Sequence, residues 1–103
     1  MKLYEYEIVL STPIGDRKGV LSIKIDNDRL EGVLSVLEQN NDVSGRINTE
    51  GICFMEGGIK TIVQTIPFQA EGELNDQSIH LVLHTVKDNM MIIGQSKKGE
   101  CSL

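Results

Sequence analysis

Apolar and polar residues alternate along most of the chain with a period of two, and helical periodicity is almost absent. At the start, Tyr4, Tyr6 and Ile8 alternate with Glu5 and Glu7. Such alternation is typical of a β-strand with one face toward a core and one toward water. The pattern predicts strands over residues 4–10, 18–26, 30–37, 43–48, 51–55, 59–74, 79–85 and 90–93.

Residues that favour tight turns separate these segments. The predicted turns cover residues 11–16, 27–28, 39–42, 49–50, 75–76 and 87–89. They are rich in Asn, Asp, Gly and Pro, which supply the backbone angles that turns need. The run Glu56-Gly57-Gly58 predicts a looser break. Pro67 lacks a backbone donor, so residues 59–74 form either one long bent strand or two shorter ones. The expected total is about eight strands.

A weak internal repeat links two of the hairpins. Residues 45–54 align with residues 72–81, because both begin with Gly and read polar, apolar, Asn, three turn-like residues, Ile, any residue, apolar. Gly at these places predicts a bend or a close approach to a neighbouring strand. Gly19, Gly32 and Gly94 mark similar bends, and a sheet that closes on itself needs such bends.

These features predict one all-β domain over residues 1–103. Eight short strands in an open sheet would leave two exposed edges, whereas an antiparallel up-and-down meander closed into a small barrel has none. A two-sheet β-sandwich is the alternative. A barrel of about eight strands has room inside for side chains or for one small ligand.

The runs Ser11–Leu21, Leu30–Leu34, Gly45–Phe54, Ala70–Leu74 and Ile92–Gly94 together resemble a loosely defined group of small bacterial all-β domains. That group has a Thr-Pro-Met-Gly turn and repeated Leu-x-Gly hairpins, and Ile14 stands here where Met is usual. The resemblance implies a small calycin-like barrel. It implies no assigned activity, so it transfers no functional residues.

Composition and charge narrow the expected partners. The 103 residues are 40% hydrophobic and 24% charged, with a net charge of -5, which is ordinary for a soluble domain. Lys97-Lys98 is the only basic doublet, so we expect no nucleic-acid partner and no docking on an anionic membrane. No leader or spanning segment is visible. Cys53 and Cys101 lie far apart, and we expect two free thiols in a cytoplasmic protein.

No group of residues predicts catalysis, a metal or a cofactor. His80 and His84 share a strand face, but a rise of about 3.3 Å per residue puts them roughly 13 Å apart, too far for one zinc ion. The carboxylates of Glu71 and Glu73, like those of the first strand, face water, so nothing raises a pKa for acid-base work. We therefore expect no enzyme, although the residues alone do not decide it.

The predicted inner face has the composition of a ligand pocket. If Leu81 and Leu83 point inward, alternation places Ile62, Ile66 and several aromatic and polar residues inside too. Pockets combine an apolar lining with a few polar anchors, but a filled core has nearly the same composition. The candidate ligand-binding residues are Tyr4, Tyr6, Phe54, Gln64, Phe68 and Thr85.

The last predicted strand is apolar on both faces, unlike a strand with one solvated face. Met90 and Ile92 belong to one face, and Met91 and Ile93 to the other. An exposed apolar patch on a soluble protein marks an interface. We therefore expect a homodimer with interface residues Val82, His84, Val86, Met91 and Ile93.

Two functions follow from these expectations. The first is a binding module for a small apolar or amphipathic molecule in the barrel. The second is a structural or assembly domain that has a filled core and acts through homo-oligomerisation.

Overall fold

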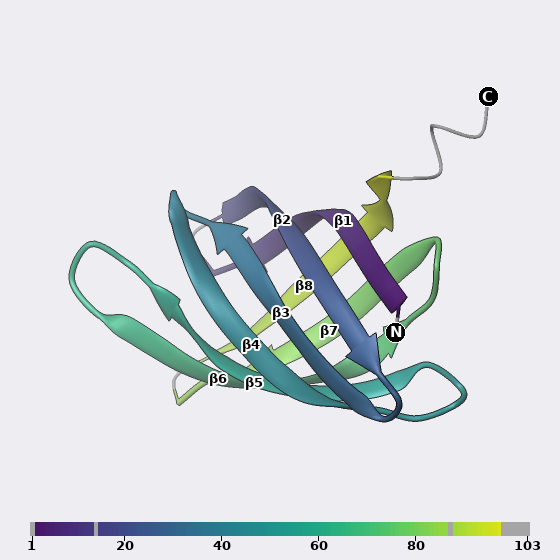
Figure 1. Cartoon of the computed structure of the whole chain (residues 1–103). Coiled ribbons are helices and arrows are strands. Elements are labelled where there is room, and N and C mark those ends of the chain that lie inside the picture. The colour runs from purple at the N-terminus through teal and green to yellow at the C-terminus, as the bar shows by residue number, and fades with distance from the viewer. Residues whose placement is uncertain (1, 14, 87, 98–103) are drawn as a thin grey trace.

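The computed structural model describes residues 2–13, 15–86 and 88–97 as a closed barrel of eight antiparallel strands, each paired with its neighbours in the sequence (Figure 1). β8 pairs with β1 and closes the sheet. This confirms the predicted meander barrel over the sandwich. Ile14, Lys87, Lys98 and Cys101, which entered the sequence predictions, lie outside the described ranges. The strands are β1 (Lys2–Thr12), β2 (Gly15–Asp26), β3 (Arg29–Val36), β4 (Gln39–Ile47), β5 (Ile52–Lys60), β6 (Thr65–Leu74), β7 (Ser78–His84) and β8 (Asn89–Ser96).

Alternate residues of every strand point into the barrel and form one apolar core. On β1 the buried residues are Tyr6, Ile8 and Leu10, and on β7 they are Ile79, Leu81 and Leu83. The predicted faces of these strands are therefore confirmed. Buried side chains from all eight strands pack together inside the barrel. The interior of an eight-stranded barrel is just wide enough for side chains to fill it.

Two inward-facing glycines allow neighbouring strands to approach closely. A Cβ atom on Gly45 would lie 1.8 Å from the carbonyl oxygen of Phe54, and one on Gly72 would lie 1.9 Å from that of His80. These are the first residues of the two repeat copies, so the predicted close approach is confirmed at both. Without a side chain there, the sheet can coil tightly enough to close.

The two ends of the barrel differ in their connections. At one end, which we call the closed end, Asn48 Oδ1 accepts hydrogen bonds from the backbone N–H groups of Glu50 and Ile52 at 2.8 and 3.0 Å. Asn75 Oδ1 accepts two more in the next turn, and the Tyr6 hydroxyl donates to the Asn75 carbonyl. Asn favours turns for this reason. We call the other end the mouth; it carries the connections from β1 to β2, β3 to β4, β5 to β6 and β7 to β8.

Two predicted breaks are wrong. The turn between β3 and β4 consists of residues 37–38, and residues 39–42 already belong to β4. β5 continues through Gly57 and Gly58. A Cβ atom on Gly57 would lie 2.7 Å from the carbonyl oxygen of Asp42, so glycine at this position lets the neighbouring strand β4 approach closely. Of the two alternatives for residues 59–74, the structure has two strands: β5 ends at Lys60, and β6, which contains Pro67, begins at Thr65.

Residues 58–68 form a two-stranded arm that extends beyond the rest of the wall (Figure 1). β4 pairs with β5 only as far as Gly57, and β7 pairs with β6 only as far as Gln69. Antiparallel pairs alternate between bonded and non-bonded residues, and Thr61 N–H donates to the Gln64 carbonyl at 2.8 Å. By that alternation Pro67 would direct its missing N–H away from β5. Proline is tolerated at this edge and protects it from pairing with another chain.

Candidate functional site at the barrel mouth

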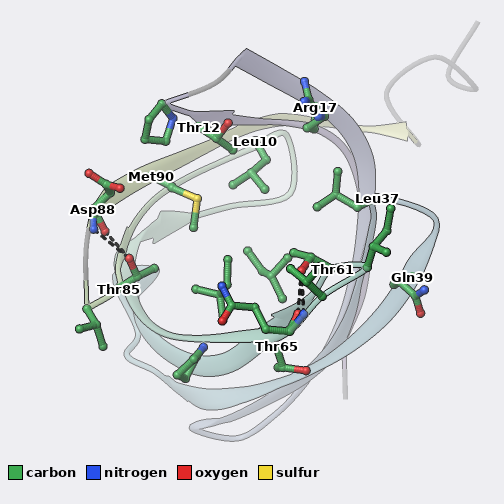
Figure 2. A pocket seen from close by; sticks show the side chains of 18 of the residues that line it. Leu10, Thr12, Arg17, Leu37, Gln39, Thr61, Thr65, Thr85, Asp88 and Met90 are labelled. Atoms are coloured by element: carbon green, nitrogen blue, oxygen red, sulfur yellow. Dashed lines mark hydrogen bonds between the residues drawn. The ribbon is translucent and has the colours of Figure 1, made fainter.

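A cavity of about 1080 Å³ opens at the mouth, where four connections that are distant in the sequence meet (Figure 2). These connections join β1 to β2, β3 to β4, β5 to β6, and β7 to β8. The buried side chains of Leu10, Ile59 and Met90 form the floor, and Figure 2 shows Leu10 and Met90 pointing into the ring of strands. The floor is thus the upper surface of the filled core.

The rim carries apolar side chains that water surrounds. Ile62 is fully exposed, and Val63 and Val86 are 85% and 93% exposed. Leu37 is partly exposed, and all four line the cavity. The described turns of the closed end present Asn, Asp and Gly instead. Exposed single apolar residues are ordinary, whereas four that line one cavity are a feature typical of interaction sites.

The turn between β3 and β4 is under backbone strain. Leu37 and Glu38 have φ angles of 56° and 62°, in the left-handed region that favours Gly, Asn and Asp. At the closed end the same region is occupied by Asn27 at 58°, which tolerates it. Turn stability therefore does not explain an aliphatic residue at position 37. Strain of this kind points to a role for the side chain.

Asn41 fastens the arm to the barrel. Its side chain is fully buried, and among the described residues it is the only buried polar one. Its Nδ2 group donates to the Leu34 carbonyl at 3.0 Å, and its Oδ1 accepts from the Lys60 N–H at 2.8 Å. The amide thus bridges β3 and β5 where the β4–β5 ladder has ended. Removing it would leave buried backbone groups unpaired at the base of the arm.

Two threonines stabilise the loops beside the cavity in the same way. Thr61 Oγ1 donates to the Gln64 carbonyl at 2.8 Å and accepts from its N–H at 3.2 Å. Thr85 Oγ1 donates to the Asp88 carbonyl at 2.6 Å and accepts from its N–H at 3.0 Å. These hydroxyls hold the loops, so they are not free anchors for a ligand. The side-chain amide of Gln64 has no such bond within the described part of the chain.

Arg17 is the only cationic side chain among the described residues that line the cavity. It has the same strand parity as Leu21 and Ile23, which point inward, and it is half-buried. Its Nη1 donates to the Asp16 carbonyl at 3.1 Å. Two carboxylates, Glu38 and Asp88, also belong to the rim and are exposed.

The predicted ligand-binding residues do not form one site. Tyr6 and Phe68 are buried in the filled core, and half-buried Tyr4 lies beside Tyr6 with ring centroids 6.0 Å apart. The predicted inward orientation of Phe54 is wrong: its side chain is 49% exposed, on the outer wall between buried Cys53 and Met55. Ile62, also predicted inside, is at the tip of the arm. Gln64 and Thr85 do line the cavity, as does Ile66. Sequence reasoning missed Leu37, Val63 and Arg17, although aliphatic residues at turn positions were a visible signal.

The predicted interface residues fall on two surfaces. Val82, His84, Met91 and Ile93 face outward on β7 and β8, where Val82 pairs with Met91. Val86 lies instead in the loop that lines the mouth. Val9 of β1 continues the apolar strip beside Ile93, and Met90 and Ile92 are buried behind it. The prediction that β8 is apolar on both faces is confirmed.

Two of the described ionisable groups outside the mouth, Cys53 and Tyr6, are buried. Burial, and then the nearby Glu73 carboxylate, raises the pKa of the Cys53 thiol to about 11, so the nucleophilic thiolate is scarce at neutral pH. Burial also raises the pKa of Tyr6. His84 contacts Glu71 at 3.3 Å and Asn89 at 3.2 Å on the outer wall. Across the described ranges, no three His, Cys, Asp or Glu side chains are grouped so that they could hold a metal ion.

The part of the chain that the structure describes contains no helix long and apolar enough to cross a bilayer. Comparison of the chain with known protein families, with curated proteins and with solved structures found no match. The geometry of the mouth therefore carries the functional argument.

Proposed function

We propose that the protein is a binding module that holds a small apolar or amphipathic molecule in the cavity at the barrel mouth. One observation carries this proposal: a cavity of about 1080 Å³ has a floor of buried Leu10, Ile59 and Met90, and most of its lining surface is apolar although polar side chains are interspersed on the rim. Ligand sites have this combination, and barrel mouths are a recurrent place for them. The core below is filled, so the ligand would occupy the mouth and not the depth of the barrel.

Displacement of a lipophilic fluorescent probe tests this function. Ile66 is half-buried on β6 and lines the cavity, so Ile66→Glu would set an ionised carboxylate against the apolar part of the ligand. We expect at least a tenfold weaker probe affinity, about 1.4 kcal/mol. Ile52→Glu is the matched control, because Ile52 is half-exposed on the outer wall. A wild-type protein that binds no probe below the concentration at which the probe aggregates would refute the function.

Self-association is the second candidate function, and the strip of Val82, Met91, Ile93 and Val9 favours it. Met91 and Ile93 are 38% and 53% exposed on adjoining rows of the wall, and a second copy would cover such a strip. Size-exclusion chromatography with light scattering should give a dimer that Ile93→Lys dissociates. Leu3→Lys, at a 61% exposed position of β1 outside the β1–β8 pairing, should leave it intact. A monomeric wild type at high concentration would refute the dimer.

The proposal includes the biological setting that the sequence suggests. A small bacterial barrel of calycin-like type, located in the cytoplasm, is compatible with a ligand-holding role. The buried free thiol of Cys53 supports a reducing compartment, since free thiols persist there.

A further inference from the structure

Arg17 lies at an inward-facing position of β2, and it is the only cationic residue among the described residues that line the cavity. Arg17 of β2 pairs with Leu10 of β1, which belongs to the floor of the cavity. Two residues further along the same face is Gly19, followed by buried Leu21. In the view into the mouth, Arg17 lies at the edge of the opening (Figure 2). Its stem therefore rises from the apolar interior, and its guanidinium lies at the rim.

The guanidinium has unused hydrogen-bonding capacity. It carries five N–H donors, and the recorded bond is one from Nη1 to the Asp16 carbonyl. Within the described ranges Arg17 has no carboxylate at ion-pair distance. Arg46, on the outer wall, is paired with Asp28 at 2.9 Å, and Lys97 is paired with Glu5 at 3.6 Å. An arginine that is half-buried beside an apolar floor and lacks a counter-charge is suited to an anionic ligand group.

We propose that the ligand of the mouth is an amphipathic anion, with an aliphatic tail on the floor and an anionic headgroup bound by Arg17. This inference rests on the proposed binding function and assigns the chemical class of the ligand. A carboxylate or sulfate accepts two parallel N–H bonds from a guanidinium. The contact would lie beside the buried apolar floor at a half-buried side chain, so it is screened less than a fully exposed ion pair.

Glu38 and Asp88 on the same rim oppose an anion, and the two effects have to be compared. Both carboxylates are exposed, so water and salt screen them. Asp88 lies across the opening from Arg17 in Figure 2, and its backbone is bonded to Thr85. Arg17 is half-buried and pairs directly with the floor residue Leu10, so we expect it to determine which headgroup is preferred.

Calorimetric titration with three twelve-carbon amphiphiles, each below its micelle concentration, tests the inference. Dodecanoate, dodecanol and dodecyltrimethylammonium share one tail and carry an anionic, a neutral and a cationic headgroup. We expect dodecanoate to bind tightest. Shorter carboxylates should lose affinity by about fourfold for each methylene removed, because each buried methylene contributes about that factor.

Variants at position 17 separate the headgroup from the tail. Arg17→Gln should weaken dodecanoate about tenfold, as expected for a partly exposed charge-assisted hydrogen bond, and should leave dodecanol within about twofold. Arg17→Lys should restore part of the loss. Arg46→Gln removes the same charge from the outer wall and should change nothing. Thermal unfolding of each variant verifies that it is folded.

The outcomes distinguish this inference from the function on which it rests. If dodecyltrimethylammonium binds as tightly as dodecanoate, or if Arg17→Gln weakens all three amphiphiles equally, the anionic class is wrong while the binding function stands. If the wild type binds none of the three and no lipophilic probe, the binding function itself is wrong.

Discussion

The substitution Glu38→Gly should stabilise the protein although it removes a side chain. Glu38 is exposed, and its side chain forms no ion pair or hydrogen bond with the residues that the structure describes. It has a φ of 62° in the second central position of the β3–β4 turn. A residue with a Cβ atom pays about 1–2 kcal/mol for this left-handed conformation, and Gly avoids that cost. Gly also loses more backbone freedom on folding, which costs about 0.5–1 kcal/mol. The expected net gain is about 0.5–1 kcal/mol.

Urea unfolding followed by circular dichroism measures this gain. The midpoint should rise with an unchanged slope, because the surface exposed on unfolding stays nearly the same. In thermal unfolding, a gain of this size corresponds to an increase in Tm of roughly 3–6 °C. Glu38→Ala is the matched control, since it removes the same carboxylate and keeps the strained backbone, so it should give no such increase.

A second control uses the closed end of the barrel. Asn27 has a φ of 58°, but Asn tolerates this region through local hydrogen bonds, so Asn27→Gly should not stabilise. If Glu38→Gly and Glu38→Ala have equal stability, backbone strain in this turn is not the cause, and the functional argument drawn from Leu37 loses its support.

Three further predictions concern other parts of the barrel. Leu37→Asn should weaken probe binding at the mouth with little change in stability, because relief of strain offsets the lost apolar contact; a loss of stability of several kcal/mol would contradict this. Gly72→Ala should destabilise by about 1–3 kcal/mol or more in urea unfolding, since the new Cβ would lie 1.9 Å from a carbonyl oxygen. Gly58→Ala should cost less, because its closest contact would be the methyl group of the exposed Thr65 side chain at 2.8 Å and the backbone atoms lie at 3.6 Å or more. In a Cys101→Ser background, iodoacetamide should modify Cys53 of the folded protein slowly at pH 8, and modification as fast as in the unfolded chain would refute the burial of Cys53. The stability associated with the raised pKa of Cys53 should be complete below about pH 8.5 and lost as the pH rises through about 11.

Alternation predicted the wall of the barrel wherever one face of a strand is polar. On β1, Glu5 and Glu7 alternate with the apolar residues and left one possible inner face, and Tyr6, Ile8 and Leu10 of that face are buried. On β5 the run from Ile52 to Met55 is apolar at all four positions, so alternation favours neither face. Its orientation is set by pairing: Met55 faces Gly45 on one side and Ala70 on the other, and these small residues leave room for it inside. Phe54 is consequently outside.

Local composition misplaced the turns for a related reason. Asn40, Asn41 and Asp42 have turn propensity, yet Asn41 is buried and bonded to both β3 and β5. That role exists only because β5 leaves the β4 ladder to form the arm, which is a tertiary event. Local preference is overridden when a neighbouring strand supplies the hydrogen bonds that a turn would otherwise provide.

The mouth was the least predictable part, because closure of the barrel creates it. Leu37, Ile62 and Val86 are separated by more than twenty residues in the sequence, and they line one cavity only because β8 pairs with β1. Each is also a local exception, since turns select Asn, Asp and Gly for sound physical reasons. One exception would be a minor cost to the fold. Aliphatic exceptions in three connections at one end, with Asn-rich turns at the other, place apolar surface at the mouth where turn propensity alone would not, and this placement supports the ligand site that we propose there.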